Sequence, residues 1–422
     1  MAKRDKNQAV PEIYERRIET LMGMLDDVRV LDLTSNGAGP GCGALFADHG
    51  AEVIKVETPV VGDDCHRFGP FLDGSSLAHA WTNRGKKSLT LDLKDPEGLN
   101  ILKELAKTAD VFMESFRPGV VKRLGISYED IKQINPKIIY CSLSAFGQTG
   151  PYAKRPGYDI IAQAMSGIAH ITGDPDGLPV ISGVALGDLF GGVNMYQAIM
   201  TAMYYREKTG IGQYIDVSLV RGMIYINGQI NQYAAGNNPG RIGPHNPVMA
   251  PYGVHRGKDG QCAIVAAVGQ PMWEKLCEVI GHPEYKNDPD FTPISQRVKN
   301  RARVTAMIEE YFSTFDDIKD AVDKLQEAGV PACKVFDIKD VCTDPHFVGE
   351  GFIVEMPVPD DVHSQATFTT RGPIARWTVE PPVQKKAPLL GQQNIELMQS
   401  VGYTEEQAAA LQQKWAHAAS KK

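Results

Sequence analysis

Short apolar segments alternate with helix-like segments through the first third of the chain, and this alternation limits the fold more than any other feature. The segments 28–33 (VRVLDL) and 52–57 (EVIKVE) each predict a buried strand, with a short helical run between them. Further strands are predicted at 89–93, 111–115 and 138–146. Strands that alternate with helices are typical of an α/β fold, in which a mostly parallel sheet is covered on both faces.

The remaining sequence predicts a second domain inserted into the first. Residues 1–24 form a charged N-terminal extension, and 25–235 form the first part of the large domain. The proline- and glycine-rich segment 236–250 is typical of a linker. We expect a smaller α+β domain at 251–345 and a return to the large domain, ending in helices, at 346–422.

Composition excludes several kinds of partner. A net charge of −7 argues against general nucleic-acid binding, which favours a basic domain. The chain has no apolar run of about 18 residues, the minimum for a membrane span, and its first residues lack the apolar region of a signal peptide. Its seven cysteines are scattered without a C-x-x-C pair, so we expect neither disulfides nor a metal site, and a cytoplasmic location.

A glycine-rich loop is predicted at 37–43 (GAGPGCG), between the first strand and the following helix. Backbone N–H groups at a helix N-terminus, here those of Gly37 and Ala38, can stabilise an anion or a developing oxyanion. A dinucleotide site is an alternative, and Glu57 stands where a ribose-binding acid could lie, but the third glycine of its fingerprint is replaced by Cys42. A tight turn with close helix packing remains a third interpretation.

Two aspartates stand before predicted helices and are candidates for catalysis. Asp188 is surrounded by glycines in ALGDLFGG and precedes a helix predicted at 189–208. The helix N-terminus would keep its carboxylate ionised, as a nucleophile requires. Asp is also a common helix cap, and Asp159, which follows Tyr158, has the same two interpretations.

Two further groups of residues suggest contacts with a ligand. Basic side chains of the first domain are able to bind phosphates, although a solvated surface is the commoner explanation: Lys86, Lys87, Lys94, Arg117 and Arg123. In the second domain, Gly269 and Gln270 lie between a strand and a helix and are interpreted either as a mobile flap or as a helix start with Pro271 in its first turn.

Six blocks in order resemble the class III CoA-transferases, the family of formyl-CoA and carnitine CoA-transferases. They include NRGKKSLTLDLKDPEG, ADVFMESFRPG, GYDIIAQAMSG and ALGDLFGG, and the resemblance covers roughly residues 25–405. It implies a Rossmann-like large domain built from N- and C-terminal segments, a smaller central domain, and an interlaced homodimer.

The resemblance implies that Asp188 attacks an acyl-CoA thioester. The cycle would pass through an aspartyl anhydride, an aspartyl-CoA thioester and a second anhydride with the acceptor acid. Each step develops an oxyanion, for which the glycine-rich segment or the flap would supply N–H donors. CoA would be a substrate, together with a small carboxylic acid, and no tightly bound cofactor is expected.

The family's CoA-binding positions correspond to residues of the first domain: Leu91, Lys94, Phe116, Arg123 and Leu124. The sequence departs from formyl-CoA transferases at three positions. Gly37 replaces a glutamine, Thr58 a basic residue and Ser115 an asparagine. The resemblance therefore does not identify the two acids.

Two other functions are compatible with the same sequence. The α-methylacyl-CoA racemases are similar but use a histidine at the position of Tyr158, together with the later aspartate, as a pair of bases. A phenol, whose ordinary pKa is about 10, is a poor base at neutral pH, so transfer is favoured over racemisation. The remaining alternative is a CoA-binding protein without catalysis, in which Asp188 is only a cap.

Overall fold

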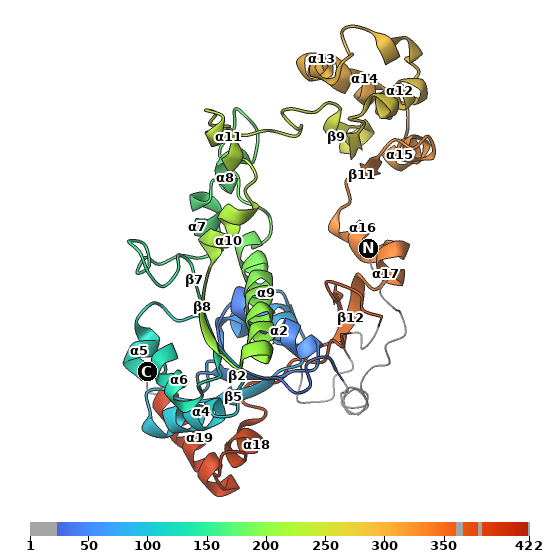
Figure 1. Cartoon of the computed structure of the whole chain (residues 1–422). Helices are drawn as coiled ribbons and strands as arrows, with labels where there is room; N and C mark the ends of the chain where they lie inside the picture. The colour runs from blue at the N-terminus through green and yellow to red at the C-terminus, as the bar shows by residue number, and fades with distance from the viewer. Residues whose placement is uncertain (1–22, 360–365, 379–381, 421–422) are drawn as a thin grey trace, which may run out of the picture. The chain divides into compact units, whose positions relative to one another are not determined.

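The structure, a computed structural model, describes residues 23–359, 366–378 and 382–420 (Figure 1). Residues 1–22, which make up most of the expected N-terminal extension, lie outside the described residues. Across the described ranges, no helix combines the length and the apolar character that crossing a bilayer requires.

The described chain divides into two compact units. The larger unit joins the residues up to Ser166 with Gly183–Ile226 and the chain from Pro345 onward. The smaller unit joins Gly167–Ser182 with Asn227–Asp344. The larger unit is thus built from both ends of the chain, and the smaller one from central segments.

A sheet of six parallel strands forms the centre of the larger unit. In spatial order the strands are β5 (Lys87–Thr90), β2 (Glu52–Glu57), β1 (Arg29–Leu33), β6 (Val111–Glu114), β7 (Ile139–Ser144) and β8 (Gln213–Ser218). Numbered along the chain, this is the order 3-2-1-4-5-6 of doubly wound Rossmann sheets. The predicted mostly parallel α/β sheet is confirmed.

Helices and two small antiparallel sheets complete the larger unit. The helices are α2 (Ala38–Asp48), α3 (Leu77–Thr82), α4 (Pro96–Ala106), α5 (Val120–Leu124), α6 (Tyr128–Ile134), α7 (Asp159–Met165), α9 (Leu186–Thr209), α10 (Leu219–Ile226), α17 (Pro345–Gly349), α18 (Asn394–Gln399) and α19 (Glu405–Ser420), with a 3-10 turn η1 (Asp64–Arg67). The small sheets pair β3 (Phe71–Leu72) with β4 (Ser75–Ser76) and β12 (Ile353–Pro357) with β13 (Thr367–Arg371).

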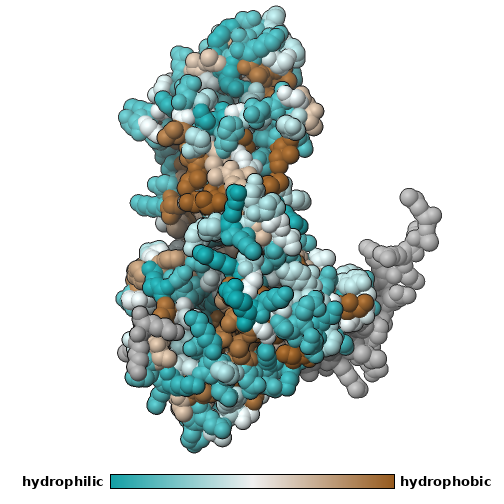
Figure 2. Space-filling view, turned by 90° about the vertical axis from the view of Figure 1, so that its left-hand side faces the viewer, coloured by the Kyte–Doolittle hydropathy of each residue, from teal (hydrophilic) through white to brown (hydrophobic). Residues whose placement is uncertain are grey.

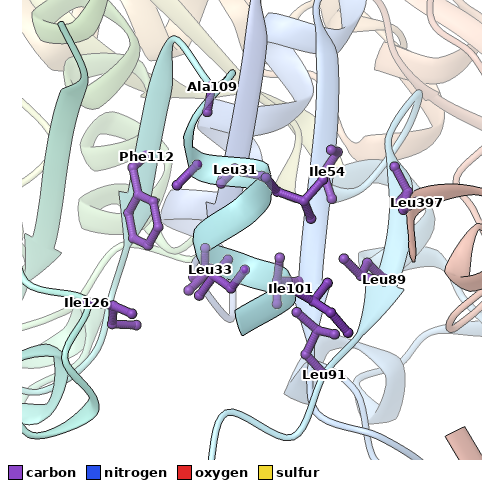
Figure 3. Close-up of a cluster of buried hydrophobic side chains, with 14 of the residues drawn as sticks. Leu31, Leu33, Ile54, Leu89, Leu91, Ile101, Ala109, Phe112, Ile126 and Leu397 are labelled. Atoms are coloured by element: carbon purple, nitrogen blue, oxygen red, sulfur yellow. The ribbon is translucent and has the colours of Figure 1, made fainter. Parts of the chain in front are cut away.

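The two faces of the sheet bury different kinds of side chain. Leu31 and Leu33 of β1 belong to an apolar core that includes Ile101 of α4 (Figure 3). Asp32, between them, points to the opposite face, because successive side chains of a strand alternate. There α2 lies so close that a Cβ at Gly43 would be 2.6 Å from the Asp32 carboxylate.

The glycine-rich segment after β1 is helical, so the loop predicted at 37–43 is wrong. Helix α2 begins at Ala38, with Gly37 as its N-cap. The small residues allow close packing instead of forming a turn. A Cβ at Gly192 of α9 would lie 2.6 Å from the Ala38 carbonyl oxygen, so this glycine lets α9 lie directly against α2 (Figure 1).

The strand predicted at 89–93 ends earlier, at Thr90. The chain turns out of the sheet at Asp92, whose carboxylate accepts the Lys94 backbone N–H at 3.0 Å. This early turn places the residues that follow β5 at the carboxyl edge of the sheet, where ligands of doubly wound folds bind.

The C-terminal helices predicted from the sequence are present as α18 and α19. The side chain and backbone of Thr404 exchange hydrogen bonds with Gln407, which caps the start of α19. Trp415 is buried in the apolar core and donates its indole N–H to Asp95 at 3.0 Å. Helix α19 therefore packs against the apolar core of the larger unit.

The smaller unit has its own core around a three-stranded antiparallel sheet of β9 (Tyr252–Arg256), β10 (Cys262–Ala266) and β11 (Ala332–Lys334). Strands β9 and β10 pair antiparallel about the turn formed by Lys258, Asp259 and Gly260. Trp273, Phe291 and Phe312 are fully buried in the core. The helical elements are α8 (Ile168–Ile171), α11 (Ile230–Ala234), α12 (Gln270–Val279), α13 (Ile294–Lys299), α14 (Arg301–Ser313), α15 (Ile318–Glu327) and α16 (Ile338–Thr343), with η2 (Lys258–Gly260) and η3 (Pro283–Asn287).

Candidate active site

Asp188 lies in the first turn of α9, which begins at Leu186 and not just after Asp188 as predicted. The helix starts earlier because Asp159 of α7 caps it: one carboxylate oxygen accepts the backbone N–H groups of Gly187 at 2.6 Å and Asp188 at 3.2 Å. The other oxygen accepts the side-chain N–H of Gln163 at 2.7 Å. The capping role considered for Asp188 therefore belongs to Asp159.

The Asp188 carboxylate lacks the stabilisation that the helix N-terminus was expected to provide. Burial, and then the negative charge of Asp159, raise its pKa to about 6. No hydrogen bond or ion pair to this carboxylate is present among the described residues. At neutral pH the group is still mostly ionised, and it is more basic than an ordinary aspartate.

Gly37 and Ala38 line the same cavity as Asp188, which has a volume of about 230 Å³. A Cβ at Gly37 would lie 3.0 Å from Oδ2 of Asp188, so the glycine leaves the carboxylate room to move or react. Tyr158 also lines this cavity, with 69% of its surface exposed. The structure thus brings Gly37, Ala38, Tyr158 and Asp188 together from three separate parts of the sequence.

A second cavity, of about 390 Å³, adjoins the first. It is lined by all of the residues at the family's CoA-binding positions: Leu91, Lys94, Phe116, Arg123 and Leu124. Ser35, Ser115 and Phe116 line both cavities. A ligand with two ends can therefore extend from the second cavity past Phe116 to Asp188.

The basic residues noted in the sequence have different roles. Lys86 is fully buried and donates to Asp32 at 2.8 Å, while Lys87 pairs at the surface with Glu52 and Glu396. Neither lines the two cavities.

Arg117 lines the Asp188 cavity together with Arg155, which sequence reasoning did not single out. The sequence signal for Arg155 is weak: it is one of two adjacent basic residues in a loop, 33 positions before Asp188.

Gly269 and Gln270, the predicted flap, belong to the smaller unit and start α12, with Gly269 as its N-cap and Pro271 in the first turn. The side chain of Gln270 donates to the Lys286 carbonyl at 2.7 Å and accepts from Arg297 at 3.1 Å. Neither residue is among those that line the cavity of Asp188.

Glu57, His66 and His79 form a cluster whose potential metal-ligating atoms lie within 4.8 Å of one another. The Glu57 carboxylate already accepts three hydrogen bonds. They come from the His66 ring at 2.9 Å, the Asp63 backbone N–H at 3.1 Å and the Ser88 hydroxyl at 2.8 Å. Its oxygens are thus satisfied by the protein, and the two imidazoles stack with their centroids 3.7 Å apart. We interpret the cluster as a structural network at the end of β2.

Comparison with known proteins identifies the family of the chain. Residues 25–394 match the family model "CoA-transferase family III". The chain is 39% identical over 336 residues to an acetyl-CoA:oxalate CoA-transferase from Acetobacter aceti, a match that covers 79% of this chain and 86% of the relative. It is 36% identical over 382 residues to a human succinyl-CoA:glutarate CoA-transferase, covering 89% and 86% of the two chains.

A solved structure, that of a CaiB/BaiF family protein from Brucella suis, matches with a TM-score of 0.79 at 35% identity and covers 90% of this chain and 99% of that one. The family model spans most of the sequence, and these relatives are matched over most of their length. The chain therefore belongs to CoA-transferase family III.

Proposed function

We propose that this protein transfers CoA from an acyl-CoA thioester to a small carboxylic acid, with Asp188 as the nucleophile. The observation that carries the proposal is the continuity of the two cavities. One contains Asp188, the other the five expected CoA-binding residues, and Phe116 lines both. The relatives, which exchange CoA between acids such as acetate and oxalate or succinate and glutarate, support the same reaction class.

The nucleotide end of CoA would occupy the cavity of Lys94 and Arg123. These cations have no ion-pair partner among the described residues, so they are available to phosphates. The pantetheine arm would then pass Phe116 and bring the thioester to Asp188. This arrangement gives binding energy remote from the reacting atoms, which can position the thioester for attack.

In the first half of the cycle, the Asp188 carboxylate attacks the thioester carbonyl, and the CoA thiolate leaves to give a mixed anhydride. The thiolate then attacks the aspartyl carbonyl, which releases the donor acid as a carboxylate and forms an aspartyl-CoA thioester. In the second half, the acceptor carboxylate displaces the thiolate, and the thiolate attacks the acceptor's acyl carbon. Product acyl-CoA forms and Asp188 returns to its ionised state, with no net hydrolysis.

Two features favour Asp188 as the attacking group. Its raised pKa makes it a stronger nucleophile than an ordinary aspartate while it stays mostly ionised. Gly37 leaves open space against its Oδ2 atom. The nearby N-terminus of α2, at Gly37 and Ala38, would stabilise the oxyanions.

The protein would need no tightly bound cofactor, and we place it in the cytoplasm as a homodimer. Exposed apolar side chains on adjacent helices support self-association: Ile160, Ile161 and Met165 of α7, Leu189 and Val193 of α9, and Ile224 and Ile226 of α10. Figure 2 shows apolar residues gathered in patches on one face. Light scattering after size exclusion would give twice the chain mass, and a monomer would refute this assembly.

The test of the mechanism is to trap the intermediate. Incubation with acetyl-CoA or succinyl-CoA and hydroxylamine should inactivate the protein and leave a hydroxamate on Asp188, identified by peptide mass spectrometry. Asp188→Ala should form no adduct and lose transfer activity by at least about 10³-fold. Glu207→Ala, at an exposed acidic position near the other end of the same helix, should behave as wild type. Full transfer by Asp188→Ala would refute the proposal.

The same assay separates transfer from the alternatives. A racemase would exchange the α-deuterium of a labelled acyl-CoA without an acceptor acid, whereas a transferase would not. A binding protein without catalysis would yield no covalent adduct with either donor.

A further inference from the structure

The lining of the Asp188 cavity has an unbalanced set of charges. Among the residues that line it, Asp188 is the single carboxylate, and Arg117 and Arg155 are the two cations. Neither arginine forms an ion pair with a carboxylate within the described ranges. The free enzyme therefore has one positive charge in excess around this cavity.

The imbalance grows during the reaction. Once Asp188 is converted to the aspartyl-CoA thioester, its negative charge is lost and both arginines remain. This is the state that receives the acceptor acid. An acceptor with one carboxylate brings one negative charge, which passes to the departing CoA thiolate as that group attacks. A second carboxylate on the same acid would match the remaining positive charge.

Arg155 is suited to hold such a second carboxylate. Its guanidinium lies over the ring of Tyr152, 4.1 Å from the ring centroid. Stacking uses the flat face of the guanidinium and leaves its N–H edge available for a bidentate contact. Tyr152 in turn packs edge-on against Phe146, so the platform under Arg155 is tied to the segment that follows β7.

The CoA phosphates do not account for Arg155. Lys94 and Arg123 line the adjoining cavity, and Arg155 does not. Arg117 follows Phe116, which lines both cavities, so Arg117 is closer in sequence to the path of the CoA arm. Of the two cations, Arg155 is the one separated from the CoA-binding positions.

We infer that Arg155 forms a subsite for the distal carboxylate of a dicarboxylic acid, and that this residue makes the enzyme selective for dicarboxylic over monocarboxylic substrates. The inference rests on the proposed function, because it concerns the acid that reacts at Asp188. Arg155 is a specificity residue and takes no part in bond making.

The experiment compares acceptors of equal carbon number with acetyl-CoA as the donor: succinate against butyrate, and glutarate against pentanoate. In wild type, kcat/KM for the dicarboxylate should exceed that for the monocarboxylate by at least about tenfold. This is the factor that one charge-assisted hydrogen bond is expected to contribute. Arg155→Gln should lower kcat/KM about 10- to 100-fold for the dicarboxylates and less than about threefold for the monocarboxylates. Arg155→Lys should retain part of the preference because it keeps the charge.

Lys154→Gln is the matched control, because Lys154 is the neighbouring exposed cation and does not line the Asp188 cavity. It should keep the wild-type preference. The inference is overturned if wild type accepts both acids equally, if Arg155→Gln lowers both equally, or if only Arg117→Gln removes the preference.

Hydroxylamine trapping separates this inference from the proposed function. An adduct on Asp188 in wild type and in Arg155→Gln, without any preference for dicarboxylates, would refute the subsite and leave the mechanism standing. Absence of both adduct and transfer in wild type would refute the mechanism itself, and the subsite with it.

Discussion

Two buried glutamates end the strands on either side of β1. Their environments shift the pKa of the two carboxyl groups in opposite directions. Glu57 ends β2 and Glu114 ends β6, with exposed fractions of 5% and 1%. Burial raises the pKa of both. At Glu57 this is outweighed by the hydrogen bond from His66, the charge of Lys55 and the Ser88 hydroxyl, so its pKa falls to about 2. Glu114 has no such cation, and its pKa rises to about 7.

The comparison shows that partners decide what a buried carboxylate can do. Glu57 stays charged at neutral pH, and its hydrogen bonds join the end of β2 to its surroundings. Glu114 accepts the Phe116 backbone N–H at 2.8 Å, but its second oxygen has no hydrogen-bond partner. Asp188 resembles Glu114, since it is partly buried and no cation pairs with its carboxylate among the described residues, and the pKa of both groups is raised.

Removing a cation from a buried carboxylate should have the largest effect on stability. Lys86→Met leaves Asp32 buried without its partner, along with acceptors on Asn83 and Pro40. We expect a loss of about 3–5 kcal/mol in the free energy of unfolding, measured by urea titration. Lys87→Met, at the next position but partly exposed, should cost less than about 1 kcal/mol. Equal losses would contradict the comparison.

Glu57→Gln should destabilise the protein by about 2–3 kcal/mol at pH 7. The folded pKa of Glu57 is below its ordinary value of 4.5, so its contribution is present above that value and is lost as the pH falls toward 2. The difference between variant and wild type should therefore narrow between pH 5 and pH 3 in urea titrations. Glu52→Gln, at a partly exposed residue of the same strand, is the control and should cost below about 1 kcal/mol.

Glu114→Gln should have the opposite effect on the free energy of unfolding: it should stabilise the protein at alkaline pH. The folded pKa of Glu114 lies above its ordinary value of 4.5, so its contribution is complete below that value and is lost as the pH rises through about 7. The variant should thus be more stable than wild type by about 1–2 kcal/mol at pH 8 and about equal at pH 5. Destabilisation at pH 8 as large as that of Glu57→Gln would show that the two sites do not differ as described.

The smallest expected effect concerns Asp188 itself. Asp159→Asn keeps a carbonyl oxygen to cap α9 but removes a negative charge that raises the pKa of Asp188. In the proposed mechanism the ionised form of Asp188 attacks, so kcat/KM should fall at acidic pH with a midpoint near 6 in wild type. The variant should move this midpoint down by about half a unit to one unit. A midpoint that stays in place, or that rises, would contradict the role given to Asp159.

Much of the fold could be predicted because its signals are local. The apolar strands and the helices between them require a parallel α/β sheet, since both faces of each strand must be covered. The order of the six sequence blocks pointed to Asp188 and to five residues that line the second cavity. A local pattern was also the source of an error. The glycines of 37–43 indicated a loop, but the segment is helical, and its small residues allow the contact between α2 and α9.

Sequence alone therefore determined the fold class, the reaction family and the candidate nucleophile, because these depend on patterns along the chain. It could not distinguish Glu57 from Glu114, both acidic residues at the end of an apolar strand. Nor could it place Arg155 in the cavity of Asp188 or assign the cap of α9 to Asp159, 29 positions away from Asp188. Only the tertiary structure decided these, because burial and charge act through space between segments that are distant along the chain.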